Sequence, residues 1–374
     1  MIRSPSVALR GAHGYVVGND IPLFDSVPSP SAPLIAMTRD GQAIGQPAGN
    51  FLFISPRVLL GDDEILHAFW GEPAAGWQPA VRADWISSAT YTASLWHATY
   101  TPDKGWSPAS PVYAAARIGW SDGMGDVAPD PVAGLHAVIV DDTARTLVHL
   151  AYSEGEWRAR RIPGVELPAY SSIAVDDDGQ VYVAYVAPDR TVESDANSVF
   201  LVRSPDHGRT WLPPRLISRS GSAQATQVHV LATQRGVHLV WAQNVTRGVV
   251  PQVVRHLVSG DGGDTWSAAE DLDIPDELGS LRTVADSCGA VHVTYEAVVY
   301  DEQGAEERGG LWYARWDGAW SALEQPFGSL NSTEADLAAG SDGAPRLVWS
   351  VVHPGATPYE TTFLAVESHL QRTN

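Results

Sequence analysis

Short apolar runs rich in β-branched and aromatic residues recur along the whole chain, and turn-forming residues separate them. One kind of run occurs six times, usually after a turn signal such as Asp178-Gly179. The six copies are Leu66–Trp70, Val148–Tyr152, Val181–Tyr185, Val237–Trp241, Val291–Tyr295 and Pro345–Trp349. Runs of this length and composition are typical of β-strands. The pattern therefore predicts six repeated units built from strands.

A tryptophan that ends a turn-like phrase recurs in step with these runs. The residues are Trp106, Trp157, Trp211, Trp266 and Trp320, at separations of 51, 54, 55 and 54 residues. The phrase is complete in Ser204–Trp211 and Ser259–Trp266 and shortened at the other three positions. In the complete phrase the Ser and Asp side chains can bond backbone groups of a tight turn, and glycine permits a positive φ. We expect a turn between the third and fourth strands of each unit, with its tryptophan packed between sheets.

These two periodic features predict an all-β fold, a six-bladed β-propeller of four-stranded antiparallel blades that forms a single domain over residues 1–374. The last repeat stops after a third strand near residues 362–366. We therefore expect a strand from residues 1–50 to complete the last blade and close the ring, which removes exposed sheet edges. The predicted blades are 51–113, 134–163, 169–218, 225–274, 280–326 and 333–370.

The amino-acid composition argues against some classes of binding partner. The formal net charge is -20, which argues against binding to nucleic acid or to an anionic membrane surface. Cys288 is the single cysteine, so no intrachain disulfide can form. Residues 1–7 lack the apolar segment of a signal peptide, and no apolar run approaches a membrane span, which predicts a cytoplasmic protein. The sequence also lacks zinc-ligand spacing, a phosphate loop and a nucleotide fingerprint, so we expect no cofactor. We also expect a monomer.

The two complete phrases and their spacing resemble the Asp-box (BNR repeat) pattern of the sialidase-like superfamily, over residues 51–370. The resemblance implies a β-propeller, but its members include sialidases, other glycoside hydrolases, lyases and non-catalytic proteins. In sialidases an Arg-Ile-Pro motif enters an early blade, and arginines grip the substrate carboxylate. Here Arg161-Ile162-Pro163 lies between the second and third repeats. The alternative is that Arg158, Arg160 and Arg161 decorate an outer strand.

The long loops all fall on one predicted face, where the family resemblance places the site. They are 71–93, 114–134, 187–198, 242–252, 296–310 and 350–361. Hydrolysis of a glycosidic bond requires two carboxyl groups that flank it. The candidates for acid, base or nucleophile are Glu72, Asp84, Asp122, Tyr170 and Glu296. The candidates for substrate binding are Trp77, Arg82, Trp85, Trp120, Arg247, Arg282 and His353, since tryptophans can stack on sugars and arginines can hold anions. The alternative for the tryptophans is that they pin the loops to the blades.

Four histidines, His67, His149, His238 and His292, share one position in the repeat. A residue repeated in this way is explained by packing between strands, so we predict neither a metal site nor a general base there. The long loops differ between repeats, which favours one asymmetric site and hence an enzyme. The first hypothesis is a sialidase-like glycoside hydrolase that acts on a carbohydrate or a glycosylated small molecule. The alternatives are a lyase, isomerase or cyclase for a small metabolite, and a lectin-like binding protein.

Overall fold

The computed structural model contains β-strands as its only regular elements in the part of the chain that it describes. That part comprises residues 2–10, 13–20, 34–38, 42–49, 54–61, 64–73, 91–120, 124–132, 134–191, 196–219, 224–246, 249–274, 277–300, 306–325, 332–339, 345–352 and 361–366. Within these ranges no helix is long and apolar enough to span a bilayer. The chain divides into two compact units: Met1–Trp85, Trp96–Ser110 and Gly279–Asn374 form the first, and Ile86–Leu95 and Pro111–Leu278 form the second.

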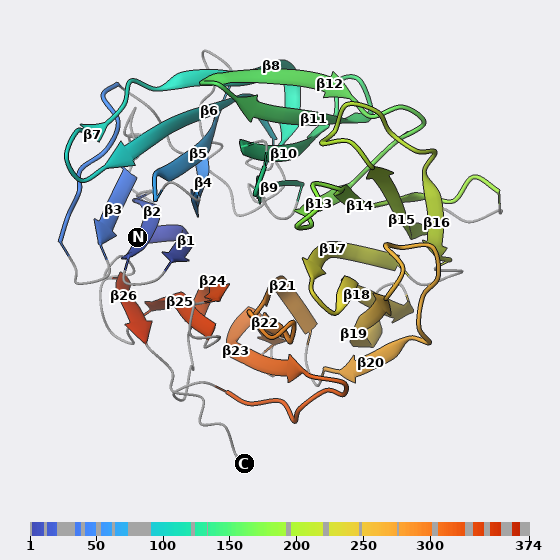
Figure 1. Ribbon diagram of the computed structural model, residues 1–374. Coiled ribbons are helices and arrows are strands. Elements are labelled where there is room, and N and C mark those ends of the chain that lie inside the picture. Colours follow the sequence, from blue (N-terminus) through green and yellow to red (C-terminus); the bar gives the residue numbers. More distant parts are fainter. Residues whose placement is uncertain are drawn as a thin grey trace. The chain divides into compact units, whose positions relative to one another are not determined.

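The first unit consists of four antiparallel meanders, in which consecutive strands pair (Figure 1). The N-terminal meander is β1 (Ile2–Arg10), β2 (His13–Asp20) and β3 (Leu34–Thr38). The next is β4 (Ile54–Leu60), β5 (Leu66–Glu72), β6 (Tyr91–Thr101) and the short β7 (Gly105–Trp106). The last two are β21 (Glu277–Ala285), β22 (Val291–Tyr300) and β23 (Glu306–Trp316), followed by β24 (Ser332–Ala339), β25 (Pro345–Val352) and β26 (Thr361–Val366).

The second unit contains three four-stranded meanders, preceded by β8 (Ser110–Gly119). The first is β9 (Gly125–Asp130), β10 (Gly134–Asp141), β11 (Thr146–Ser153) and β12 (Glu156–Arg161). The second is β13 (Tyr170–Val175), β14 (Val181–Pro188), β15 (Asn197–Ser204) and β16 (Arg215–Ser218). The third is β17 (Gln224–Thr233), β18 (Gly236–Thr246), β19 (Val249–Ser259) and β20 (Glu270–Asp273).

The role predicted for residues 1–50 is wrong in one respect. β1, β2 and β3 form a sheet of their own, and within the described residues β26 pairs with β25 alone. The N-terminal segment therefore adds a meander where a single closing strand was expected, and the described residues form seven meanders where six were predicted. The segment holds three strands because Tyr15, Val16 and Val17 form a central run that is buried between two neighbours.

The second predicted blade, 134–163, begins too late. β9 lies in the segment expected to be a loop and pairs with β10, so that the run Val148–Tyr152 is in the third strand and not the second. The second strand carries His136, which the repeat alignment missed. Because β10 and β11 are joined by a turn of four residues, 142–145, the two similar runs lie close together in the sequence.

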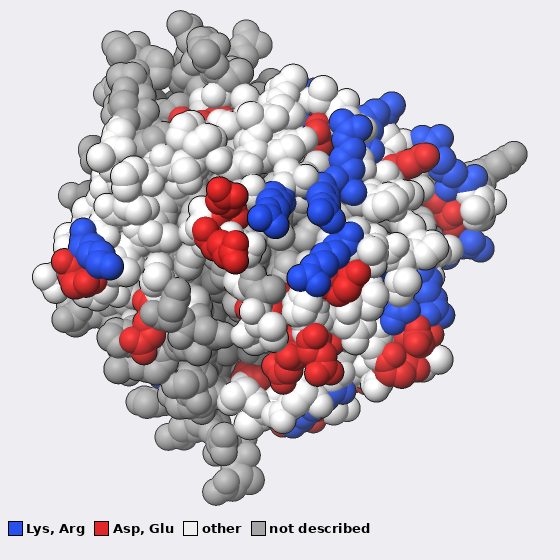
Figure 2. All heavy atoms as spheres, turned by 45° about the horizontal axis from the view of Figure 1, so that its top comes forward, with Lys and Arg blue, Asp and Glu red and all other residues white. Residues whose placement is uncertain are grey.

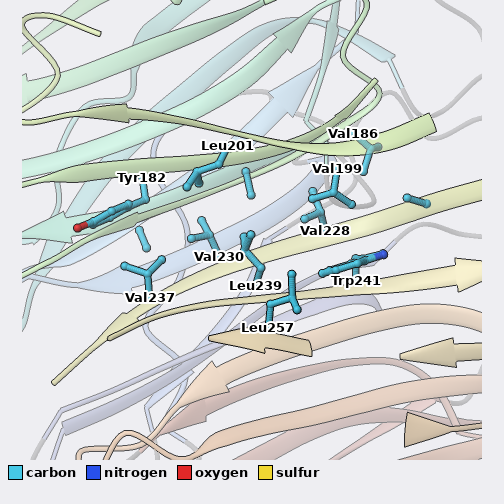
Figure 3. Close-up of a cluster of buried hydrophobic side chains, with 13 residues drawn as sticks. Tyr182, Val186, Val199, Leu201, Val228, Val230, Val237, Leu239, Trp241 and Leu257 are labelled. Carbon is cyan, nitrogen blue, oxygen red and sulfur yellow. The ribbon is translucent and has the colours of Figure 1, made fainter. Parts of the chain in front are cut away.

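Each meander buries apolar side chains against its neighbour. Between the second and third meanders of the second unit, Val199, Leu201, Val230 and Leu239 pack with Trp241, which is fully buried (Figure 3). Complete burial of such side chains stabilises the fold by about 1.5 to 3 kcal/mol each. The alternation of inward and outward side chains along these strands follows from the strand period of two.

The complete turn phrase adopts the predicted hydrogen bonds. Asp206 accepts from the Thr210 amide at 2.7 Å and from its hydroxyl at 2.7 Å, while Ser204 Oγ accepts from the Gly208 amide at 2.8 Å. Gly208 has φ 74°, a conformation that glycine adopts without strain. Trp211 packs in the core between this meander and the preceding one, with its ring 5.1 Å from that of His149. Both the turn and the packing of its tryptophan are confirmed here.

The repeated histidines form buried pairs between second and third strands. The pairs are His67–His97 at 2.9 Å, His136–His149 at 2.7 Å and His238–His256 at 3.0 Å between ring nitrogens. His292 takes the same place and contacts the Tyr313 hydroxyl at 2.7 Å. The prediction that these histidines serve packing is confirmed. Each of the three pairs also includes a histidine that the sequence repeat did not reveal.

Candidate functional site

Polar side chains on the first strands of the meanders bind backbone amides of the next first strand. In the second unit Asp126 on β9 accepts from the Ile173 amide at 3.2 Å, and Ser172 on β13 accepts from the Val230 amide at 3.2 Å. The first unit repeats this contact. There Asp336 on β24 accepts from the Val7 amide at 2.9 Å, and Ser6 on β1 accepts from the Val58 amide at 3.1 Å. These contacts fix polar side chains along the first strands of the meanders.

Asp336 differs from the other members of this series in its electrostatic surroundings. Burial raises the pKa of its carboxyl, although the nearby charges of Arg282 and Arg57 and the Val7 amide all favour the ionised form. The residue as a whole is half-buried. A carboxyl group whose pKa is raised by desolvation beside fixed positive charge is a candidate for acid–base chemistry. Arg282 comes from β21 and Arg57 from β4, so three separate meanders supply this cluster.

Glu296 contacts the strand that carries Arg282. Its Oε2 accepts a hydrogen bond from Ser280 Oγ at 3.5 Å, and Ser280 is on β21, two residues before Arg282. Residues two apart on a strand share one face. Of the predicted residues, Arg282 thus lies near Asp336, which was not predicted, and Glu296 bonds to Ser280 on the same strand as Arg282. Glu72, the third predicted residue described in this unit, is at the end of β5 and half-buried.

This arrangement combines an acid, a second carboxylate and fixed positive charge. A carboxyl group with a raised pKa can donate a proton near neutral pH, while a second carboxylate can act as base or nucleophile. Two guanidinium groups can hold an anionic group of a ligand through paired hydrogen bonds. In the described part of the chain, no cluster of His, Cys, Asp and Glu has the geometry of a metal site.

Two predicted residues of the second unit have structural roles. Trp120 is fully buried, and its ring leaves so little space that a Cβ on Gly125 would lie 2.6 Å from it. A fully buried ring presents no surface on which a ligand could stack, so the structure favours the alternative that Trp120 pins a loop. Tyr170 begins β13 and packs, half-buried, against the core between the second and third meanders.

The remaining predicted site residues lie outside the described part of the chain. They are Trp77, Arg82, Asp84, Trp85, Asp122, Arg247 and His353. Arg161, from the Arg-Ile-Pro motif, is exposed on β12, the outermost strand of its sheet. This position favours the alternative that the arginines of the motif decorate an outer strand.

Sequence reasoning missed Asp336 and Arg57. Both are single charged residues inside short first-strand runs, Ala335-Asp336-Leu337 and Pro56-Arg57-Val58, where the apolar neighbours dominate the pattern. A charged residue in a strand that buries its neighbours on both sides was the available signal.

Comparison with known proteins identifies the fold. No protein-family model and no curated protein sequence matches the chain. Among solved structures, leech intramolecular trans-sialidase has a TM-score of 0.53 at 11% identity, over 85% of this chain and 68% of that one. Hadza microbial sialidase Hz136 has a TM-score of 0.51 at 15% identity, over 90% and 74% of the two chains. A Dyadobacter fermentans protein of unknown function has a TM-score of 0.51 at 14% identity, over 97% and 93%. The chain has the sialidase-like β-propeller fold that glycoside hydrolases share.

Proposed function

We propose that the protein is a sialidase-like glycoside hydrolase that acts on a carbohydrate carrying an acidic group. The observation that carries this proposal is the Asp336 carboxyl, which burial holds at a raised pKa beside Arg282 and Arg57. The fold, which known sialidases share, supports the choice of substrate class.

In the proposed mechanism Asp336 donates its proton to the oxygen of the leaving group. Glu296, oriented by Ser280, acts as the second carboxylate, and its distance from Asp336 in the complex with substrate would decide between retention and inversion. Arg282 and Arg57 bind the acidic group of the sugar and keep it next to the acid. The loop residues Asp84, Asp122, Trp77, Arg82, Trp85, Arg247 and His353 stay predictions for contacts with the rest of the substrate.

A lectin-like function is less well supported, because binding alone does not require a carboxyl group with a raised pKa. A lyase acting on an acidic sugar would also use the two arginines, but it needs a base to abstract a proton. The raised pKa of Asp336 favours an acid and therefore a hydrolase.

The test is turnover of fluorogenic glycosides, including a glucuronide and a sialoside, by the wild type and by Asp336→Asn and Glu296→Gln. Asparagine keeps an oxygen that can accept from the Val7 amide, so the fold should be retained while the proton is lost. We expect kcat to fall about 100-fold or more in Asp336→Asn. The control is Asp271→Asn, which removes a surface carboxylate paired with Arg255. Unchanged turnover in Asp336→Asn would refute the proposed role, and formation of an unsaturated sugar product would identify a lyase instead.

The wild-type pH profile provides a second readout. Since the protonated form of Asp336 is the active one, kcat should fall as the pH rises through its pKa. Replacement of Arg282 by glutamine removes a charge that favours ionisation, so this fall should shift to higher pH. A shift to lower pH would contradict the assignment of Asp336 as the acid.

A further inference from the structure

Five arginines form an exposed basic cluster on the second unit, which we call the arginine surface. They are Arg145, Arg158, Arg160, Arg161 and Arg209. Lys and Arg side chains gather over part of the face in Figure 2, although the whole chain carries a net charge of -20. Local positive charge on an acidic protein is an electrostatic feature that needs its own explanation.

Hydrogen bonds and strand register show that the five residues are neighbours. Arg160 on β12 donates from Nη1 to the Arg209 carbonyl at 3.2 Å. Arg161 pairs with Val148, close to the start of β11, and Arg145 is the last residue of the turn that leads into that strand. Because side chains alternate along a strand, Arg158 and Arg160 share one face of β12 and Arg161 takes the other. The arginine surface thus wraps around the outer edge of the sheet.

These arginines also lack acidic partners. None of the five forms an ion pair within the described residues, whereas other exposed arginines of the same unit do. Those pairs are Arg117–Asp142 at 3.3 Å, Arg190–Glu166 at 3.8 Å and Arg219–Asp189 at 2.7 Å. Glu156 lies two residues before Arg158 on the same face of β12, but within the described residues it forms no ion pair with any of the five arginines.

Protection of an edge strand against aggregation explains part of this pattern, since charged residues on an edge discourage pairing. One or two charged residues of either sign are sufficient to protect an edge strand, so this role does not require five arginines. Five guanidinium groups of one sign repel one another, and no ion pair within the described residues offsets the repulsion. An external polyanion would supply the missing partner.

We propose that the arginine surface docks an anionic polysaccharide, such as a chain of uronic acid residues, through contacts separate from those of the proposed catalytic residues. Guanidinium groups bind carboxylates through paired hydrogen bonds, and Arg158 and Arg160 present two of them about 7 Å apart along an extended strand. The overall charge of the protein repels nucleic acid, whose charge density is far higher than that of a uronic acid chain. The choice of a glycan over an acidic peptide rests on the proposed function.

The test measures retardation of the protein in native gels that contain polygalacturonate, with dextran as the neutral polymer. The variant is Arg158→Gln/Arg160→Gln/Arg161→Gln. Its matched control, Arg117→Gln/Arg190→Gln/Arg219→Gln, removes the same charge from ion-paired positions in the same unit. We expect the apparent Kd for polygalacturonate to rise about tenfold or more in the variant and less than about threefold in the control, with retardation weakened by added salt.

Equal loss of retardation in both variants would overturn the proposal, because net charge alone would then account for binding. Tighter binding to poly-glutamate or to a single-stranded oligonucleotide than to polygalacturonate would overturn the glycan as partner. Turnover of the small fluorogenic glycosides should be unchanged in the arginine variant. If every glycoside is inert but polymer binding is lost in that variant alone, the docking surface stands and the proposed hydrolase activity fails.

Discussion

Acidification should destabilise the protein through its buried imidazole pairs. Burial lowers the pKa of His97, His149 and His256 to about 3 and that of His238 to about 4. The paired imidazole lowers the pKa of the first three further, and Arg235 lowers that of His238. In the unfolded chain the pKa of histidine is about 6.5. The unfolded state therefore binds more protons than the folded state below pH 6.5, and the free energy of unfolding falls as the pH drops from about 6.5 towards 4.

The magnitude follows from the linkage relation. Between pH 7 and pH 5 each imidazole that stays neutral in the folded state lowers the free energy of unfolding by about 2 kcal/mol. Four such groups would remove about 8 kcal/mol, which is comparable to the whole stability of a typical domain. We thus expect the urea midpoint to fall steeply between pH 7 and pH 5.

The assay is urea unfolding at pH 7, 6 and 5, followed by tryptophan fluorescence, for the wild type and for His238→Asn/His256→Gln. The variant lacks two titrating groups, so its loss of stability between pH 7 and pH 5 should be about 4 kcal/mol smaller than that of the wild type. The control is Tyr182→Phe at the equivalent position of the neighbouring meander, because burial raises the pKa of this tyrosine far above the range studied. An identical pH dependence in the wild type and the histidine variant would refute the reasoning, whatever their absolute stabilities.

Two further predictions concern packing. Gly208→Ala should destabilise the protein in urea unfolding by about 2 kcal/mol more than Gly155→Ala does. Both glycines have a positive φ, so alanine is strained at either position. A Cβ at Gly208 would in addition lie 2.1 Å from the His149 ring, whereas a Cβ at Gly155 would meet no atom within 4 Å. Equal losses would show that the imidazole moves aside freely. Trp120→Phe should lower the melting temperature and leave KM unchanged, since the ring is fully buried; a raised KM with unaltered stability would restore a ligand contact for this residue.

Much of the fold could be predicted because the strands are short and their turns carry distinctive residues. The spacing of the tryptophans reflects one turn per meander, and Trp211 shows why the residue recurs, since it fills the space between two sheets. The predicted propeller class and the structural role of the repeated histidines rested on this regularity. Such patterns can be recognised in a sequence because side chains at equivalent positions of each repeat pack in the same way.

The errors arose where contacts distant in sequence create a strand. Gly125–Asp130 reads as a loop because it contains glycine, proline and two aspartates, yet it forms β9. Its order comes from pairing with β10 and from Asp126, whose carboxylate accepts from the Ser172 hydroxyl and the Ile173 amide on the next first strand. Such partners are 46 and 47 residues away, so a local reading of propensity cannot find them.

The candidate site was hard to predict for a related reason: a scaffold contact and the proposed chemical role fall on one residue, Asp336. Asp336 binds the amide of the next first strand, but Ser6 and Ser172 make the same contact, so a serine is sufficient for that purpose. A serine can thus replace the carboxylate in this contact, which Asp126 also makes, and the raised pKa distinguishes Asp336 as the proposed acid. The free energy of unfolding of Asp336→Ser, measured by urea unfolding, should lie within about 1 kcal/mol of the wild-type value. Turnover of any hydrolysed glycoside should fall about 100-fold or more. Retained turnover would show that Asp336 serves the scaffold alone, and unfolding of Asp336→Ser with active Asp336→Asn would lead to the same conclusion.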